Sequence, residues 1–295
     1  MKELAIVTDG VCDLTNEIIE KYGIETIPYR ILFGQETYRV WHNDKFTISL
    51  EEFCSKLATT SKETLPRTSL PSPAEFKQAF DEALKSAQNV IAVLLTSGMS
   101  GAVQTAQMVV KNFYNNGNVT IFDSQQTMTG TGIQALEAAK MVADGKSKSE
   151  ILNRLEALQL RVRTLLVMND LDYLEKQGRL GPIENIRKKN PDLIPAIHMK
   201  DGILHPLTIF QNEDDLITRF ENFAKKIAQQ NETGDIFLTH INHQKVTKII
   251  YDILVDSALD GTTIYYYPAS AILGVYSGPH SIGLSYIGNF DSSWL

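Results

Sequence analysis

The chain has 295 residues and a mass of 33.0 kDa, which is enough for two domains of ordinary size. Its formal charge of -7 and the absence of a run of Lys or Arg argue against nucleic acid as a partner. Its two cysteines cannot form a multi-bridge framework, no signal peptide is recognisable, and no apolar run approaches the ~20 residues that span a bilayer. We therefore expect a cytoplasmic protein that contacts lipid, if at all, without a transmembrane segment.

The first part of the chain reads as a strand, a loop rich in Asp and Gly, a helix that ends at Gly23, and a second strand over 24–33. Ser49 and Glu52 predict a capping box before the next helix. Ser72, Pro73 and Glu75 supply the N-cap, N1 and N3 positions of the helix after that. Ser72 therefore has a structural role, whereas Thr68 and Ser69 lie in the preceding loop without one.

Strands are then predicted over 89–95 and 118–124, with helices over 102–114 and 129–143. Strands that alternate with helices indicate an α/β fold with a mostly parallel sheet. The segment GTGIQA at the start of the last helix matches a dinucleotide-binding pattern by letters. Its glycines lie too far past the strand, however, so helix packing is the better explanation.

A further helix begins at Ser147, with Glu150 at N3, and we place a domain boundary near residue 160, giving domains over 1–160 and 161–295. A short helix ends at Gly178, and Asp201-Gly202 predicts a hairpin in which Pro206 marks an edge strand. Helices over 214–230 and 246–259 and strands over 235–241 and 262–267 follow. The Gly-rich ending over 274–288 is interpreted as a loop whose backbone approaches a ligand or another loop closely.

The loop TSGMSG, residues 96–101, follows a buried strand and begins a helix, which is where α/β sheets collect anionic ligands. Ser100 is explained as a helix cap, whereas Ser97 is not needed there and is the better ligand contact. A serine nucleophile is poorly supported because G-x-S-x-G is incomplete and no His and Asp partners follow.

The sequence offers little support for a nucleotide site or a metal site. No phosphate-binding loop of the type G-x-x-x-x-G-K-[ST] is present, so we expect no ATP site and no bound cofactor. His240 and His243 lack further metal ligands in the sequence around them, so an ordinary strand-end pair is favoured. Asp9 and Asp13 could bind a cation, although Asp13 equally suits the turn into a helix.

Six segments, in order, resemble the DegV family, whose members in Gram-positive bacteria include the fatty-acid-binding FakB subunits of fatty acid kinase. They are VTDGVCDL, RTSLPSPAEF, LLTSGMSG, FDSQQTMTG, LDYLEKQGRL and ILGVYSGPHSIGLSYIG. The resemblance implies two α/β domains with a lipid-binding cleft between them. It implies that a long-chain fatty acid lies in a buried tunnel, with its carboxylate contacted by Thr68, Ser69 and Ser97.

The same resemblance implies that the chain is not itself the catalyst. It would present the carboxylate to a separate ATP-binding kinase for phosphorylation to an acyl phosphate. Transient contact with a membrane surface is compatible with that role.

The sequence departs from the family pattern at two places. This chain has Gly10-Val11-Cys12 where the family usually has one or more hydroxyl side chains. It has Tyr276 where the family usually has a histidine, and His280, four residues further on, could compensate as a contact or fill the pocket. A serine-dependent acyl hydrolase or transferase, and a lipid sensor without kinase coupling, are the alternatives. Three roles are open for Arg179: a contact with a partner protein, an ion pair at the domain interface, or a solvated charge. We favour a structural role.

Overall fold

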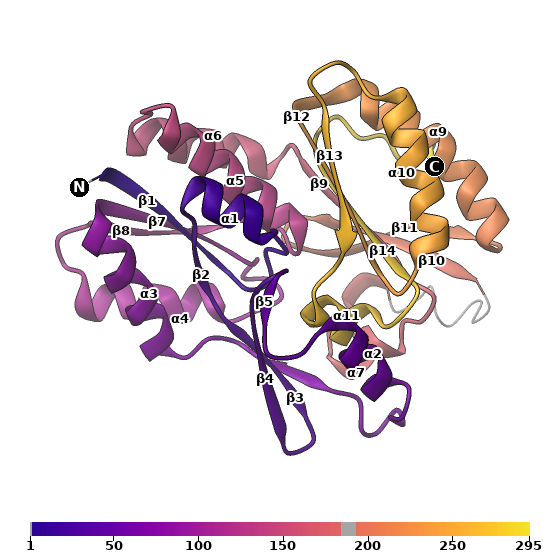
Figure 1. Cartoon of the computed structure of the whole chain (residues 1–295), viewed down its shortest axis with the longest axis horizontal. Helices are drawn as coiled ribbons and strands as arrows, with labels where there is room; N and C mark the ends of the chain where they lie inside the picture. The colour runs from indigo at the N-terminus through magenta and orange to yellow at the C-terminus, as the bar shows by residue number, and fades with distance from the viewer. Residues whose placement is uncertain (1, 184–192) are drawn as a thin grey trace.

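The computed structural model describes residues 2–183 and 193–295, which form three sheets (Figure 1). Sheet A is parallel, with the strand order β2-β1-β7-β8. Its strands are β1 (Lys2–Asp9), β2 (Glu25–Ile27), β7 (Ala87–Leu94) and β8 (Val119–Asp123). The parallel sheet predicted for the first half of the chain is therefore present.

Helices cover both faces of sheet A (Figure 1). Their bounds are α1 (Asn16–Tyr22), α3 (Pro73–Ser86), α4 (Ala102–Phe113), α5 (Thr129–Ala143) and α6 (Lys148–Gln159). The capping boxes predicted at Ser72 and Ser147 are confirmed, with both reciprocal hydrogen bonds formed at each. Local side-chain chemistry therefore determines where these two helices begin.

Sheet B was not predicted. It is antiparallel, with the order β5-β4-β3-β6, and consists of β3 (Tyr29–Phe33), β4 (Glu36–His42), β5 (Lys45–Phe46) and β6 (Arg67–Ser69). The single strand expected over 24–33 is wrong, because the chain leaves sheet A after Ile27 and enters sheet B at Tyr29. Pro28, which has no N–H for a strand ladder, separates the two strands. The helix α2 (Leu50–Leu57) follows β5. Ser49 accepts a hydrogen bond from the Glu52 amide, which is one of the two reciprocal bonds of the capping box predicted there.

Sheet C has six strands in the order β11-β10-β9-β14-β12-β13 and is mixed, since β12 and β13 are parallel and the other pairs antiparallel. Its strands are β9 (Val162–Val167), β10 (Ile194–Lys200), β11 (Ile203–Phe210), β12 (Asn231–Ile241), β13 (Thr263–Pro268) and β14 (Ser281–Gly288). The expectation of mostly parallel sheets thus does not extend to the second domain. The hairpin at Asp201-Gly202 is present, with φ of 51° and 77°, and β11 is an edge strand.

Helices α9 (Glu213–Gln230) and α10 (Gln244–Ser257) pack on one face of sheet C, and α7 (Asp172–Lys176) lies at its end (Figure 1). Two short 3-10 helices are η1 (Gly181–Ile183) and η2 (Ser292–Trp294). Sheets A and C give the two-domain α/β arrangement that was expected, and the change between them falls between α6 and β9. The boundary near residue 160 stays a prediction. In the described ranges, no helix combines the length and apolar character needed to cross a membrane.

The Gly-rich ending is not a loop: it forms α11 (Ala271–Ser277) and β14, which lies between β9 and β12 inside sheet C. The expected close approach is nevertheless real. A Cβ on Gly283 would lie 2.5 Å from Met128 Cε and 2.7 Å from Thr239 Oγ1, so glycine allows the neighbouring layer to contact the strand backbone.

Helix α5 packs between the two domains, against β1 and β7 of sheet A and against β9 and β14 of sheet C. A Cβ on Gly130 would lie 2.0 Å from Thr164 Oγ1, and one on Gly132 would lie 2.3 Å from the Cys12 carbonyl oxygen. The helix-packing explanation of GTGIQA is therefore confirmed, because the glycines bring the helix close to both domains.

We predict that Gly132→Ala destabilises the fold by about 1–3 kcal/mol, even though alanine is the better helix former. The added methyl group would meet the Cys12 carbonyl oxygen, which is rigid backbone. The matched control is Gly101→Ala, where the nearest atom to the new Cβ lies 3.6 Å away. Urea unfolding measures both. A Gly132→Ala variant as stable as the control would contradict this account of α5.

Candidate functional site

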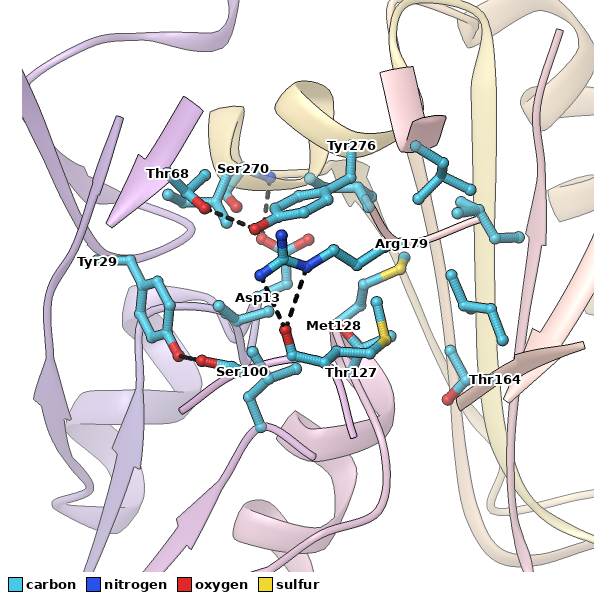
Figure 2. Close-up of a pocket in the computed structure, with 18 of the residues that line it drawn as sticks. Asp13, Tyr29, Thr68, Ser100, Thr127, Met128, Thr164, Arg179, Ser270 and Tyr276 are labelled. Atoms are coloured by element: carbon cyan, nitrogen blue, oxygen red, sulfur yellow. Dashed lines mark hydrogen bonds between the residues drawn. The ribbon is translucent and has the colours of Figure 1, made fainter. Parts of the chain in front are cut away.

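A cavity lies where the loops that follow β1, β7 and β8 meet sheet C, β6 and α11 (Figure 2). These loops leave the carboxyl ends of three parallel strands, the position at which open α/β sheets bind ligands. The lining residues come from both domains: Val11, Asp13, Tyr29, Thr68, Leu70, Leu95, Met99, Ser100, Gly101, Thr127, Met128, Thr164, Leu166, Leu174, Arg179, Ile197, Leu204, Ser270, Ile272, Leu273 and Tyr276.

One side of the cavity is apolar. Six of its lining residues belong to one buried hydrophobic cluster: Met128, Leu166, Leu174, Ile197, Leu204 and Leu273. The cluster joins the start of α5 to sheet C, α7 and α11. A ligand on this side would contact aliphatic side chains and would be separated from water.

The other side carries hydroxyl groups. Thr68 Oγ1 and Tyr276 Oη are 2.5 Å apart, a hydrogen bond that joins β6 to α11 (Figure 2). Tyr29 Oη and Ser100 Oγ form a second pair at 3.0 Å. Burial raises the pKa of Tyr29 well above its usual range, so this phenol stays neutral. Both pairs can donate to an anion without bringing charge of their own.

Arg179 adds a positive charge to the lining. Its Nε and Nη2 atoms each donate to the Met99 carbonyl oxygen at 3.3 Å (Figure 2). Nη1 donates to the Gln177 carbonyl oxygen. Among the carboxylates of the described residues, none forms an ion pair with this guanidinium. It is therefore a cation held by neutral carbonyl groups at the cavity, an arrangement that favours an anionic ligand.

Two buried carboxyl groups lie beside the hydroxyl pairs. Asp9 Oδ1 and Oδ2 accept hydrogen bonds from the amides of Val11 and Leu95, and Asp13 Oδ1 accepts one from the Ser270 amide at 2.9 Å. Burial raises the pKa of each carboxyl to about 6, against the effect of these hydrogen bonds. Asp13 lines the cavity, whereas Asp9 does not.

Of the predicted contact residues, Thr68 and Tyr276 come together in the cavity, and Ser69, Ser97 and His280 do not line it. Ser69 follows Thr68 on a strand, so its side chain faces the opposite way, and its hydroxyl donates to the Leu70 carbonyl oxygen. Ser97 is exposed and its amide donates to the Asp123 carboxylate. Their roles as head-group contacts stay predictions, and the cavity offers Ser100 instead.

His280 is exposed beyond the end of α11, where its ring makes an edge contact with His243 at 5.5 Å between centroids. Four residues would bring two side chains together on a helix, but Gly278, with φ 65°, ends the helix between Tyr276 and His280. His280 therefore does not reach the cavity to compensate for the histidine that Tyr276 replaces.

The Gly10 departure has a packing reason. A Cβ on Gly10 would lie 2.2 Å from the Val40 carbonyl oxygen, so sheet B approaches this loop too closely for any side chain. Val11, the next residue, lines the cavity, and Cys12 is fully buried. The loop after β1 thus contributes an apolar contact, Val11, at a place where the family pattern has hydroxyl side chains.

Sequence reasoning missed Tyr29. It favoured a helix cap for Ser100, and it gave Asp13 either a cation-binding role or a place in the turn into a helix, but it made neither residue a head-group contact. Ser100 Oγ does accept from the Ala102 amide, at 3.3 Å, but it also faces the cavity. Tyr29 gave no signal, because sheet B itself was not predicted. The described part of the chain gathers no three His, Cys, Asp or Glu side chains in an arrangement that could hold a metal ion.

Comparison with known proteins gives a family. The model of the DegV family, described as uncharacterised proteins, matches residues 3–289. A DegV domain-containing protein of Caldanaerobacter subterraneus subsp. tengcongensis is 29% identical over 284 residues, which cover 96% of this chain and 98% of the relative. Protein DegV of Bacillus subtilis is 25% identical over 95% of this chain and 98% of its own length.

Solved structures of this fold are similar over almost the whole chain. A Thermus thermophilus DegV family protein, described as binding fatty acid, has a TM-score of 0.87 and 22% identity, covering 97% of this chain and all of that one. The B. subtilis DegV structure, described as a fatty acid binding protein, has a TM-score of 0.82 and 23% identity, covering 98% of this chain and 100% of its own. A Eubacterium eligens structure loaded with heptadecanoic acid has a TM-score of 0.79 and 18% identity, over 97% and 100%. From its six ordered motifs, its fold and the family match over residues 3–289, the chain belongs to the DegV family.

Proposed function

We propose that this protein binds a long-chain fatty acid in the cavity between its two domains. The observation that carries the proposal is one cavity with an aliphatic side and, opposite, two hydroxyl pairs and an arginine without a carboxylate partner among the described residues. The T. thermophilus and B. subtilis proteins, described as binding fatty acid, and the E. eligens protein, described as loaded with heptadecanoic acid, support this ligand class.

The two sides of the cavity would have different energetic roles. Burying about a dozen methylenes at ~0.8 kcal/mol each gives roughly 10 kcal/mol before the costs of association. A hydrogen bond to a charged group contributes only about 1.5–3 kcal/mol net. The acyl chain would supply most of the affinity, and the polar groups would orient the carboxylate.

The head group would lie among Thr68, Tyr276 and Ser100, with Arg179 as the cationic contact. Tyr276 can donate a hydrogen bond where the family has a histidine, but it cannot carry the positive charge of an imidazolium at neutral pH. In this chain the guanidinium would supply that charge. This assignment replaces Ser97 by Ser100, because Ser100 lines the cavity and Ser97 does not.

We further propose that the protein presents the carboxylate to a separate kinase, which forms an acyl phosphate. The sequence has no phosphate-binding loop, and the side chain of Arg179 is exposed as well as lining the cavity, so a partner could reach this end of it. A hydrolase has less support. The hydroxyl paired with Ser100 is that of Tyr29, a neutral, buried phenol and therefore a poor general base, and no histidine is among the described residues that line the cavity.

We predict that Thr68→Val and Tyr276→Phe each weaken fatty acid binding about tenfold, because each removes one polar contact to the carboxylate and leaves the shape of the cavity unchanged. Isothermal titration calorimetry with delipidated protein and oleate measures the affinity. Ser69→Ala and Ser97→Ala are the controls and should stay within about twofold of the wild type. Unchanged affinity in both cavity variants would remove this head-group site.

We predict that the purified protein alone transfers no phosphate from ATP to oleate, and that a purified ATP-binding subunit of a fatty acid kinase turns over the bound acid. Arg179→Gln should reduce this turnover, since the head group loses its cationic contact. Mass spectrometry of the acyl phosphate, trapped with hydroxylamine, provides the readout. Tight binding of oleate with no turnover by any such subunit would favour a lipid sensor instead.

A further inference from the structure

The carboxyl group of Asp13 lies in the wall of a cavity for which we have proposed a carboxylate ligand. Asp13 is 1% exposed and lines the cavity. Its Oδ1 atom accepts the Ser270 amide, whereas Oδ2 is buried and accepts no hydrogen bond from the described residues. Figure 2 draws Asp13 among Ser270, Tyr276 and Arg179. The proposed head-group site thus already contains an acidic oxygen without a donor.

The position of the Asp13 carboxyl group is fixed by the backbone conformation and by hydrogen bonds. Its φ of 55° is a left-handed conformation that aspartate tolerates better than most residues. Its carbonyl oxygen accepts from Tyr267 Oη at 2.8 Å, and its side chain accepts from the Ser270 amide. Both bonds cross from the loop after β1 to the second domain, so the carboxyl group cannot turn away from the cavity without breaking contacts between the domains.

The charges around Asp13 do not neutralise it. Among the described residues that line the cavity, Arg179 is the one cation, and its guanidinium donates to the carbonyl oxygens of Met99 and Gln177 and not to Asp13. Asn43 and Ser270 are neutral polar neighbours that favour the ionised carboxyl, and Asp44 lies close enough to oppose its ionisation. Among the described residues, the other titratable neighbours come from β1 and the loop after it, β3, β13 and α11, and none of them is a base: Asp9, Cys12, Tyr29, Tyr267 and Tyr276.

Two carboxylates in one poorly solvated site cannot both stay ionised, so such a pair retains a proton that neither group would hold alone. We propose that Asp13 and the ligand head group share one proton, so that binding of a fatty acid anion to this site takes up a proton from solvent. The added proton bridges Asp13 Oδ2 and a carboxylate oxygen of the ligand. The two carboxyl groups together then carry one negative charge instead of two, and the guanidinium of Arg179 balances that charge. This inference rests on the proposed function.

The site would therefore distinguish a head group that carries its own hydrogen-bond donor from one that must take up a proton. A fatty acid anion needs one proton from solvent, whereas a fatty alcohol brings its own hydrogen-bond donor for Oδ2. Burial raises the pKa of the empty Asp13 to about 6, so at pH 7.5 the group is mostly ionised before binding. Binding of the anion should therefore strengthen as the pH falls toward 6, and binding of the alcohol should not.

The test is calorimetry of the delipidated full chain with dodecanoate at pH 7.5, in phosphate and in Tris, whose ionisation enthalpies differ widely. We expect uptake of about one proton per ligand, and an affinity that rises about tenfold for each pH unit lowered between pH 8 and pH 6.5. Dodecanol should show neither effect. Uptake below about 0.2 proton by the wild-type protein overturns the inference, whatever any variant does.

Asp13→Asn keeps the side-chain shape and an acceptor for the Ser270 amide but cannot take up the proton. We expect dodecanoate to bind this variant with an affinity that changes less than twofold between pH 8 and pH 6.5. Glu25→Gln is the matched control: burial raises the pKa of Glu25 as well, but it lies on β2 outside the cavity, so this variant should retain the proton uptake. Full uptake in Asp13→Asn would place the proton elsewhere and overturn the inference.

The two proposals fail differently. If dodecanoate binds the wild-type protein without a buffer-dependent heat, the shared proton is lost and the proposed function stands. If dodecanoate and oleate produce no binding heat at any pH, both proposals fail together.

Discussion

The close contact of α5 with both domains is the packing constraint on which the site depends. Gly130 and Gly132 lie two residues apart near the start of this helix, the first against Thr164 in sheet C and the second against the loop after β1. Side chains at these positions would push one domain or the other away from the helix. The cavity is formed by that same loop, by Thr127 and Met128 just before α5, and by β9, so its width is set by how closely α5 packs.

The cavity is electrostatically incomplete in a way that suits an acidic lipid. Arg179 is held by carbonyl oxygens and no described carboxylate pairs with it, while Asp13 retains a buried oxygen without a donor. Burying the Asp13 oxygen in this state costs free energy. A carboxylic acid head group could accept hydrogen bonds from the guanidinium and share a proton with Asp13, so one ligand would satisfy both residues.

Much of the fold follows from local sequence, because helix caps and apolar periodicity act over a few residues. The starts of α3 and α6 could be predicted from Ser72 and Ser147, and the bounds of α5 from its apolar pattern. Which sheet a strand joins depends on distant partners, so the division at Pro28 and the whole of sheet B were missed. The ending was interpreted as a loop because its glycines resemble turn signals, whereas Gly274 and Gly283 are close-packing positions within α11 and β14.

Those residues of the candidate site that belong to the family motifs could be predicted from the sequence. Thr68 and Tyr276 come from distant segments and meet in space. The choice between Ser97 and Ser100 depends on which way a short loop turns its side chains, and spacing alone cannot decide this. Asp13 looked like a residue that begins a helix, since nothing local shows that α11 and Tyr267 will bury its carboxyl group beside a ligand cavity.

The most direct test of the central claim is native mass spectrometry of the protein as purified, followed by denaturing extraction and identification of any small molecule it carries. The account predicts one long-chain fatty acid per chain, retained because its acyl part lies against the buried cluster that includes Leu166, Ile197 and Leu273. A protein that carries no lipid, and that takes up none after incubation with fatty acids from dodecanoate to oleate, would contradict it.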